Sequence, residues 1–449
     1  MSDYLFMLES HLDGGQAKAT AAMQRQATEA GMNVWITGGA MRDMLRGAPI
    51  HDLDFTVERD AIGAGRALAE SVGGAVVSED PWKRGVELML PGGVAASVGN
   101  VRTEKYLKPG GKPHIGAAAI HEDLKRRDFT INAIGLSLNR GSRGLLIDPT
   151  NGQADLVNRE LRTTNASAFF DDPTRIFRLI RFRHTLGFEL APRTQSQLEN
   201  ALLEGYADTA QPSALAREIR VAATDLNVVG MMEAFDANGL LRLLSPALTG
   251  PKLNAAGLTK LAEALRSVVP HGTPGGFAAF LHVLVEKLNA AERAAVVRAF
   301  ELTEAESAAI AKLDAEAEKL EAALKAPRMR RPSDVWSALR EASTDEVLML
   351  LCESTAGVVQ ERIRTFYDKY LQEAQEVTED QVLATGAKPG TARFEKTLRT
   401  LIAARLNARP VKPEEPEPEP TPLGKTAHQG VAPVVADEAA IPPSAKVRN

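Results

Sequence analysis

The sequence predicts an α+β protein in which a small mixed sheet with helices comes first and an all-α remainder follows. Two observations predict this class. Short strand-like runs alternate with helical segments up to about residue 140, and nearly every segment beyond Asn151 carries apolar residues at helical spacing. The 449-residue chain is also too long for one hydrophobic core, because domains usually run to about 100 to 200 residues.

The first part of the chain alternates between the two kinds of element. Helices are expected over 12–30, where Gly31 is well placed as the stop, and over 61–72. The segment 128–138 begins a further helix or strand. Short strands are expected at 34–36, 52–57, 75–77, 85–90 and 95–102.

The remainder reads as helix after helix. A basic break at 327–332 precedes the last helices, which end near Ala408. Residues 410–449 are rich in proline and glutamate and lack aromatic residues, so we expect a disordered tail there. The main helices are expected at 172–186, 194–203, 213–226, 228–244 and 304–326.

The composition is that of a folded protein. Apolar residues make up 44% of the chain and charged residues 25%, which excludes wholesale disorder, a collagen-like chain and a coiled coil. The net charge is -5, so a polyanionic partner would have to meet a local basic patch. The single cysteine, Cys352, is expected to be a small buried hydrophobe. The N-terminus has no signal-peptide pattern and no run of about 18 apolar residues occurs, so we expect a cytoplasmic protein without a membrane partner.

Two carboxylates in one expected strand are the first candidate site. Asp52 and Asp54 stand at positions i and i+2, which point to the same face of a strand. Adjacent carboxylates repel unless a cation sits between them, and hard oxygen ligands suit Mg²⁺, as in two-metal sites. The Gly38-Gly39 turn would let backbone N–H groups approach a phosphate. Each piece alone is compatible with a solvated pair and an ordinary turn.

Two further segments carry arginine beside aspartate. Residues 126–133 are compatible with a simple helix start capped by Asp128 or Thr130. In 172–182, Asp172 is the expected N-cap and Pro173 lies in the first turn. Arginines then recur every three residues beside an apolar stripe, either as a solvated face or as donors for a base edge next to the carboxylate. These arginines are Arg175, Arg178 and Arg181.

Taken in order, these motifs resemble the class II tRNA nucleotidyltransferase and bacterial poly(A) polymerase family of the polymerase-β-like superfamily, from about Gly31 to Ala247. Residues 38–54 look like the catalytic motif, 126–133 like the ribose-selecting motif, 148–156 like the hinge between head and neck, and 171–175 like the amino-acid template. Asp171 departs from the family, which usually has Glu there. The resemblance implies a nucleotidyltransferase head (1–147), a helical neck (148–212), a body (213–300), an RNA-binding tail (301–409) and the disordered segment (410–449).

The resemblance also implies roles for single residues. Asp52 and Asp54 would hold two Mg²⁺ ions, and Glu104 stands where a third carboxylate is expected, with a surface salt bridge as the alternative. Asp172 and Arg175 would read the base, because an aspartate accepts from the amino group that cytosine and adenine share and uracil and guanine lack. The other nucleotide-binding candidates are Gly38, Gly39 and Arg42 for the triphosphate, Arg127, Asp128 and Asn132 for the ribose, and Arg178 and Arg181 for orienting the base-reading pair.

Two segments bear on the RNA substrate. Residues 107–113 look like the family's flexible loop, which is tied to adding a terminal A after two Cs. Arg328, Arg330 and Arg331, with a looser resemblance at 377–390, are candidates for phosphate contacts to tRNA, with a solvated basic loop as the alternative.

The expected activity is template-independent addition or repair of the 3′-terminal CCA of tRNA from CTP and ATP, with no obligate protein partner evident. The alternatives left open are an A-adding or CC-adding specialist, a poly(A) polymerase, and a catalytically inactive RNA-binding protein.

Overall fold

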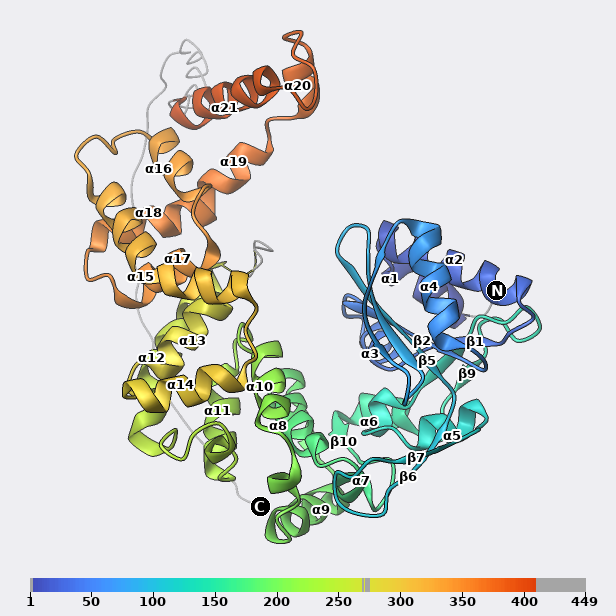
Figure 1. Ribbon diagram of the computed structural model, residues 1–449. Helices are drawn as coiled ribbons and strands as arrows, with labels where there is room; N and C mark the ends of the chain where they lie inside the picture. Colours follow the sequence, from blue (N-terminus) through green and yellow to red (C-terminus); the bar gives the residue numbers. More distant parts are fainter. Residues whose placement is uncertain (1–2, 269, 271–274, 409–449) are drawn as a thin grey trace, which may run out of the picture. The chain divides into compact units, whose positions relative to one another are not determined.

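The computed structural model describes residues 3–268, 270 and 275–408, and Figure 1 traces them from an N-terminal sheet into a long series of helices. The predicted α+β class is confirmed. The expected disordered segment 410–449 lies outside the described residues. None of the helices in the described part of the chain combines the length and the apolar content that crossing a bilayer requires.

The sheet has seven strands in the order β3-β4-β5-β2-β1-β8-β9. Only β2 and β5 pair in parallel, and all the other neighbours are antiparallel. A mixed sheet was expected from the alternation of strands with helices. The strands are β1 (Val34–Thr37), β2 (Asp52–Val57), β3 (Ala75–Asp80), β4 (Gly85–Leu90), β5 (Val94–Asn100), β8 (Gly135–Ser137) and β9 (Leu146–Ile147).

The two faces of the sheet differ in chemistry because strand side chains alternate. In β2, Leu53, Phe55 and Val57 are fully buried in the core. Helix α4 (Ala61–Val72) packs on β3, β4 and β5 and also against α2 (Gly14–Glu29). The opposite face of β2 carries Asp52 and Asp54, so the pattern that builds the core also sends both carboxylates to the other side.

Short elements connect the sheet to the helical part. Strands β6 (Thr103–Lys105) and β7 (His114–Gly116) form a separate antiparallel ribbon. One 3-10 turn, η1 (Thr130–Asn132), and α6 (Gly152–Asn158) follow. The remaining short helices of this region are α1 (Asp3–His11), α3 (Gly39–Leu45) and α5 (Ile120–Lys125).

The helical part departs from the expected all-α neck in one respect. Strands β10 (Glu160–Leu161) and β11 (Glu189–Leu190) pair in parallel on either side of α8. The helices are α7 (Ala168–Asp171), α8 (Thr174–Leu186), α9 (Pro192–Leu203), α10 (Pro212–Val221), α11 (Val228–Ala237), α12 (Ala255–Val268), α13 (Phe277–Val285), α14 (Ala290–Ala299), α15 (Glu304–Lys325), α16 (Pro332–Leu339), α17 (Thr344–Glu353), α18 (Gly357–Thr365), α19 (Leu371–Gln375), α20 (Glu379–Leu383) and α21 (Ala392–Asn407).

Most expected elements are confirmed, and β2, α4 and β4 have the expected bounds. Two expected helices end early. The helix expected to reach residue 244 ends at Ala237, because Gly239 adopts a positive φ of 65° that breaks the helical run. The helix expected to reach 226 ends at Val221. The segment 128–138 contains both alternatives, since η1 is followed by β8.

Candidate active site

All thirteen catalytic and nucleotide-binding candidates line one cavity of about 1150 Å³. They come from α3 and the glycine before it, from β2 and β6, from η1 and the two residues near its start, and from α8 and the residue near its start, which are far apart in sequence. The lining residues are Gly38, Gly39, Arg42, Asp52, Asp54, Glu104, Arg127, Asp128, Asn132, Asp172, Arg175, Arg178 and Arg181.

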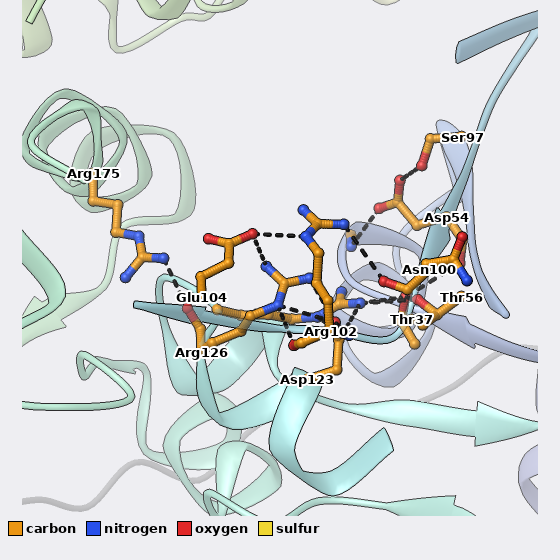
Figure 2. A network of polar contacts seen from close by, with 12 residues as sticks. Thr37, Asp54, Thr56, Ser97, Asn100, Arg102, Glu104, Asp123, Arg126 and Arg175 are labelled. Atoms are coloured by element: carbon orange, nitrogen blue, oxygen red, sulfur yellow. Dashed lines mark hydrogen bonds and ion pairs between the residues drawn. The ribbon is translucent and has the colours of Figure 1, made fainter. Parts of the chain in front are cut away.

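The carboxylate pair lies on the open face of β2. Asp54 stands opposite Ser97 of β5, and the Ser97 hydroxyl donates to Asp54 Oδ1 at 2.7 Å (Figure 2). The Gly39 N–H donates to Asp54 Oδ2 at 3.3 Å. Placement in the cavity desolvates the carboxyl of Asp52 and raises its pKa, and repulsion from Asp54 raises this pKa further. Asp54 is therefore fixed by two donors, while Asp52 is exposed to the negative charge of Asp54, which Arg42 offsets only in part.

Gly38 permits this arrangement in two ways. Its φ of 71° is in the left-handed region, and a Cβ atom built on it would lie 2.6 Å from Asp54 Oδ2. The same Cβ would lie 3.3 Å from Arg127 Nη1. A side chain at position 38 would consequently displace the carboxylate.

Arg127 contacts the two central strands β1 and β2 next to the carboxylate pair. Its Nη2 donates to the hydroxyls of Thr37 and Thr56 at 3.0 Å each and to Asp123 Oδ2 at 3.1 Å. Asp123 is fully buried, and although burial opposes ionisation, Arg127 and Arg126 lower its pKa. Arg127 thus joins β1, β2 and α5 at the cavity.

Glu104 belongs to a buried ion-pair cluster. Its side chain is 6% exposed, and its Oε1 accepts from Arg102 at 2.7 Å and from Arg126 at 3.1 Å (Figure 2). Tyr106 donates to Oε2 at 2.8 Å. Burial alone would raise the pKa of Glu104, but the attraction of Arg126 and Arg102 outweighs it and lowers the pKa to about 2. The alternative of a salt bridge is confirmed, although the ion pairs are part-buried and not at the surface. The role of Glu104 as a third metal ligand stays a prediction.

A continuous chain of polar contacts begins at α3. Both oxygens of Asp43 accept from Arg42, at 2.8 Å each, and Arg42 Nη1 donates to Asn132 Oδ1 at 2.9 Å. Asn132 Nδ2 in turn donates to Asp128 Oδ1 at 3.1 Å. The triphosphate candidate and the ribose candidates therefore form one network.

The same chain continues into α8 and α10. Arg178 Nη2 lies 2.6 Å from Asp128 Oδ2, and Arg181 Nε donates to Glu218 Oε2 at 2.6 Å. Arg178 Nη1 lies 3.9 Å from Glu218 Oε1, which closes the link. Burial would raise the pKa of Asp128, but the attraction of Arg178 and Arg175 exceeds this effect and lowers it to about 2.

The two base-reading candidates are linked through the backbone, since the Arg175 N–H donates to the carbonyl oxygen of Asp172 at 3.1 Å, while their side chains have other partners. Arg175 is 6% exposed and donates to the carbonyl oxygens of Arg126, at 2.8 Å, and Ala168, at 3.4 Å. Asp172 Oδ1 accepts from the backbone N–H and the hydroxyl of Thr174. The prediction of Asp172 as the N-cap of α8 is wrong by one residue, because Pro173 occupies that position and α8 begins at Thr174. A solvated arginine face is wrong for Arg175 and for Arg181, whose side chain is 12% exposed.

Sequence reasoning missed the counter-ions of these arginines. Glu218 and Asp123 lie outside the motifs, and nothing in their local pattern distinguishes them from surface acids. Asp43 follows Arg42 directly in the sequence, so the local sequence could have indicated it as a partner of that arginine. The predicted RNA-binding residues Arg328, Arg330 and Arg331 are exposed in the α15–α16 connection and do not line the cavity.

Comparison with known proteins agrees with this geometry. Residues 34–162 match the family model described as the poly A polymerase head domain. An A-adding tRNA nucleotidyltransferase of Halalkalibacterium halodurans is 33% identical over 275 residues, which are 58% of this chain and 62% of the relative. Residues 34–162 of the chain therefore resemble the head domain of this family, and the similarity to the tRNA nucleotidyltransferase extends beyond that domain.

Other relatives of the family carry two different names. An A-adding tRNA nucleotidyltransferase of Geobacter sulfurreducens is 34% identical over 51% of this chain and 27% of its own length. A multifunctional CCA protein of Xanthomonas oryzae pv. oryzae is 31% identical over 58% of this chain and 65% of its own length. The chain thus spans between about a quarter and two thirds of these curated relatives.

Two solved structures are similar to this chain in fold. A CCA-adding enzyme in an apo form matches with a TM-score of 0.55 and 24% identity, covering 92% of this chain and 97% of that one. The Thermotoga maritima CCA-adding enzyme complexed with tRNA matches with a TM-score of 0.53 and 23% identity, covering 90% and 95%.

Proposed function

We propose that this chain adds nucleotides from CTP and ATP to the 3′ end of tRNA without a nucleic-acid template, completing or repairing CCA. The observation that carries the proposal is the single cavity shared by the carboxylates of β2 and by Asp172 and Arg175 of the helical neck. Transfer chemistry and base selection would then act on one nucleotide. The division into head, neck, body and tail remains part of the proposal, supported by the end of the sheet at Ile147.

The donor set of the cavity fits magnesium. Its lining carries nine lysine or arginine side chains and nine carboxylates, so it offers a triphosphate little net positive charge. Asp52 and Asp54 would hold two Mg²⁺ ions. Desolvation in the cavity and then repulsion from Asp54 raise the pKa of Asp52, and a bound cation would oppose both effects. When bound, the metal would neutralise phosphate charge and activate the attacking hydroxyl.

The chain's own residues would orient the nucleotide. Gly38, Gly39 and Arg42 would lie along the triphosphate, and Arg127, Asp128 and Asn132 would form the ribose site. Because Asp128 already holds Asn132 and Arg178, the ribose would enter a site that is preorganised by charge-assisted hydrogen bonds. Arg178 and Arg181, tied to Glu218, would keep the base-reading pair in place.

Base selection would use the free side of Asp172. Asp172 Oδ2 has no hydrogen-bond partner among the described residues, so it is available to the amino group of cytosine or adenine. Arg175 would exchange its contacts to backbone carbonyls for the ring acceptor of the base. A base without the amino group would leave the carboxylate unpaired, which costs about 1 to 3 kcal/mol or more for a charged group.

A second candidate is an A-adding specialist, favoured by the names of relatives that are 33 to 35% identical to this chain. The test uses tRNA transcripts that end at the discriminator base, at C and at CC, each with CTP, ATP or both. We expect all three to be extended to CCA and then to stop. Extension of the CC transcript alone would indicate an A-adding enzyme, CC addition alone a CC-adding enzyme, and unlimited A addition a poly(A) polymerase.

The metal assignment predicts the behaviour of an Asp52→Ala, Asp54→Ala double variant. It should lose nucleotide incorporation by at least about a thousandfold, since the charge that holds the metal is gone. Binding of tRNA, measured by filter retention, should be largely retained, because the exposed arginines 328, 330 and 331 are proposed to carry phosphate contacts. Residual incorporation at the wild-type rate would refute the assignment.

A further inference from the structure

The segment 107–113, which joins β6 to β7, is attached to the helical neck by its tip. The Gly110 N–H donates to the carbonyl oxygen of Phe170 at 3.2 Å, two residues before Asp172. A Cβ atom built on Gly110 would lie 3.2 Å from the Pro173 ring and 3.0 Å from Thr209 Oγ1. The tip therefore fits closely against the residue that follows Asp172.

The other end of the segment is attached to the sheet through Trp82. The Lys112 Nζ lies 3.5 Å from the centroid of the Trp82 ring, within the range of a cation–π contact. The Trp82 Nε1–H donates to the carbonyl oxygen of Pro113 at 3.1 Å. Both the face and the polar edge of one indole are thus engaged by a single segment.

The backbone of Trp82 is fixed by hydrogen bonds in its turn. It lies in the turn between β3 and β4, where Asp80 Oδ1 accepts from the N–H groups of Trp82 and Lys83 at 3.0 and 2.9 Å. Lys83, the next residue, lines the candidate active site. The indole is nonetheless 47% exposed, so burial in the core does not account for a tryptophan at this position.

We propose that Trp82 and Lys112 are positioning residues, forming a latch that holds the segment 107–113 against Pro173 and thereby sets which bases Asp172 accepts. The proposal rests on the proposed function, in which Asp172 reads the base. The contacts at Trp82 and the hydrogen bond at Gly110 hold the segment together. Loss of the contacts at Trp82 would leave only the hydrogen bond at Gly110, so this bond would open more often and Asp172 would occupy a wider range of positions. Correct and incorrect bases would then differ less in how well they pair.

The experiment compares the full-length wild type with Trp82→Ala and Lys112→Met. Amide hydrogen exchange of the peptide that contains Gly110 reports on the latch without any need for activity. We expect exchange at Gly110 to be about tenfold faster in Trp82→Ala, given the strength of one exposed cation–π contact and one hydrogen bond. The ratio of kcat/KM for CTP to that for UTP should fall by about the same factor.

Two further variants sharpen the result. Trp82→Phe keeps the aromatic face for Lys112 and loses the N–H donor, so its exchange and its CTP-to-UTP ratio should lie between those of wild type and Trp82→Ala. Val77→Ala is the matched control, because Val77 is 60% exposed on β3 of the same hairpin. It should behave as wild type in both measurements.

The possible outcomes test the latch and the proposed function separately. Unchanged exchange in Trp82→Ala overturns the latch, and faster exchange with an unchanged CTP-to-UTP ratio overturns its role in selection. A wild-type chain that incorporates no nucleotide refutes the proposed function, while the exchange rates still decide whether the latch exists.

Discussion

Single residues in this cavity act through the groups that surround them. Asp52 and Asp54 share one strand face, yet Asp54 accepts two hydrogen bonds whereas the Asp52 carboxyl has a raised pKa. Arg175 and Arg178 lie one turn apart, but the first contacts backbone carbonyls and the second a buried carboxylate. Residue type alone therefore does not define a role. Two residues of the same type differ here in their hydrogen-bond partners and in their surroundings.

A Gly38→Ala variant should test the close approach at the glycine turn. We expect incorporation to fall at least about a hundredfold, because the new Cβ would push the Asp54 carboxylate out of place. Steady-state incorporation on a CC-ending transcript would measure it. Gly47→Ala is the control, since Gly47 has a similar φ of 69° but nothing within 4 Å of its Cβ position. Equal losses in the two variants would attribute the effect to backbone strain alone.

At the scale of elements, α6 is locked to η1. Asp148 accepts from the N–H groups of Gly152 and Gln153 at 2.8 and 2.9 Å, and the Thr130 hydroxyl donates to Asp155 Oδ2 at 2.6 Å. The predicted hinge motif is thus packed on the predicted ribose motif. Movement at α6 would be transmitted to Asn132, the last residue of η1.

A Gly152→Ala variant should break this packing. Its Cβ would lie 2.1 Å from the carbonyl oxygen of Thr130, and a backbone atom cannot rotate away. We expect a loss of about 1 to 3 kcal/mol in unfolding free energy, measured by urea denaturation. Gly141→Ala, with nothing within 4 Å of its Cβ position, should change stability by less than about 1 kcal/mol. A Gly152→Ala protein as stable as Gly141→Ala would show that α6 can move away from η1.

At the scale of the molecule, buried ion pairs join the segment before η1 to helices α8 and α10. The chain of polar contacts from Asp43 to Arg181 crosses three parts of the sequence. For Glu104 and Asp128, arginines hold the pKa near 2 although burial opposes this. Their folded-state pKa values lie below the ordinary values of 4.5 and 3.8. Both carboxylates therefore stabilise the fold at pH values above these ordinary pKa values.

Acid should therefore lower the free energy of unfolding over a defined pH range. The contribution of these two carboxylates is full above about pH 5 and is lost as the pH falls from there toward 2, where the folded state must also take up protons. Glu104 alone accounts for a loss on the order of 3 kcal/mol. Urea denaturation at pH 7, 4 and 3 measures the slope. Glu104→Gln should be less stable at pH 7 and show a flatter slope, and parallel slopes for the two proteins would contradict the assignment.

The local sequence was sufficient for most of the elements and for the candidate residues that line the cavity. Periodicity of two placed Asp52 and Asp54 on one face of β2, and helical periodicity identified α8 with Asp172 at its start. Both follow from interactions within a few residues, which a local pattern encodes. The same reasoning was too coarse for β10 and β11, because two-residue strands have no period of their own.

Only the tertiary structure decided which charges neutralise one another. Glu218 lies 37 residues from Arg181, and Asp128 lies 50 residues from Arg178. The contact between Pro113 and Trp82 spans 31 residues. Such pairs form because the folded backbone brings them together in a poorly hydrated space, where an unpaired charge is costly. The sequence by itself determined the chemistry that is available, and the packing of distant segments decided which groups remain free to use it.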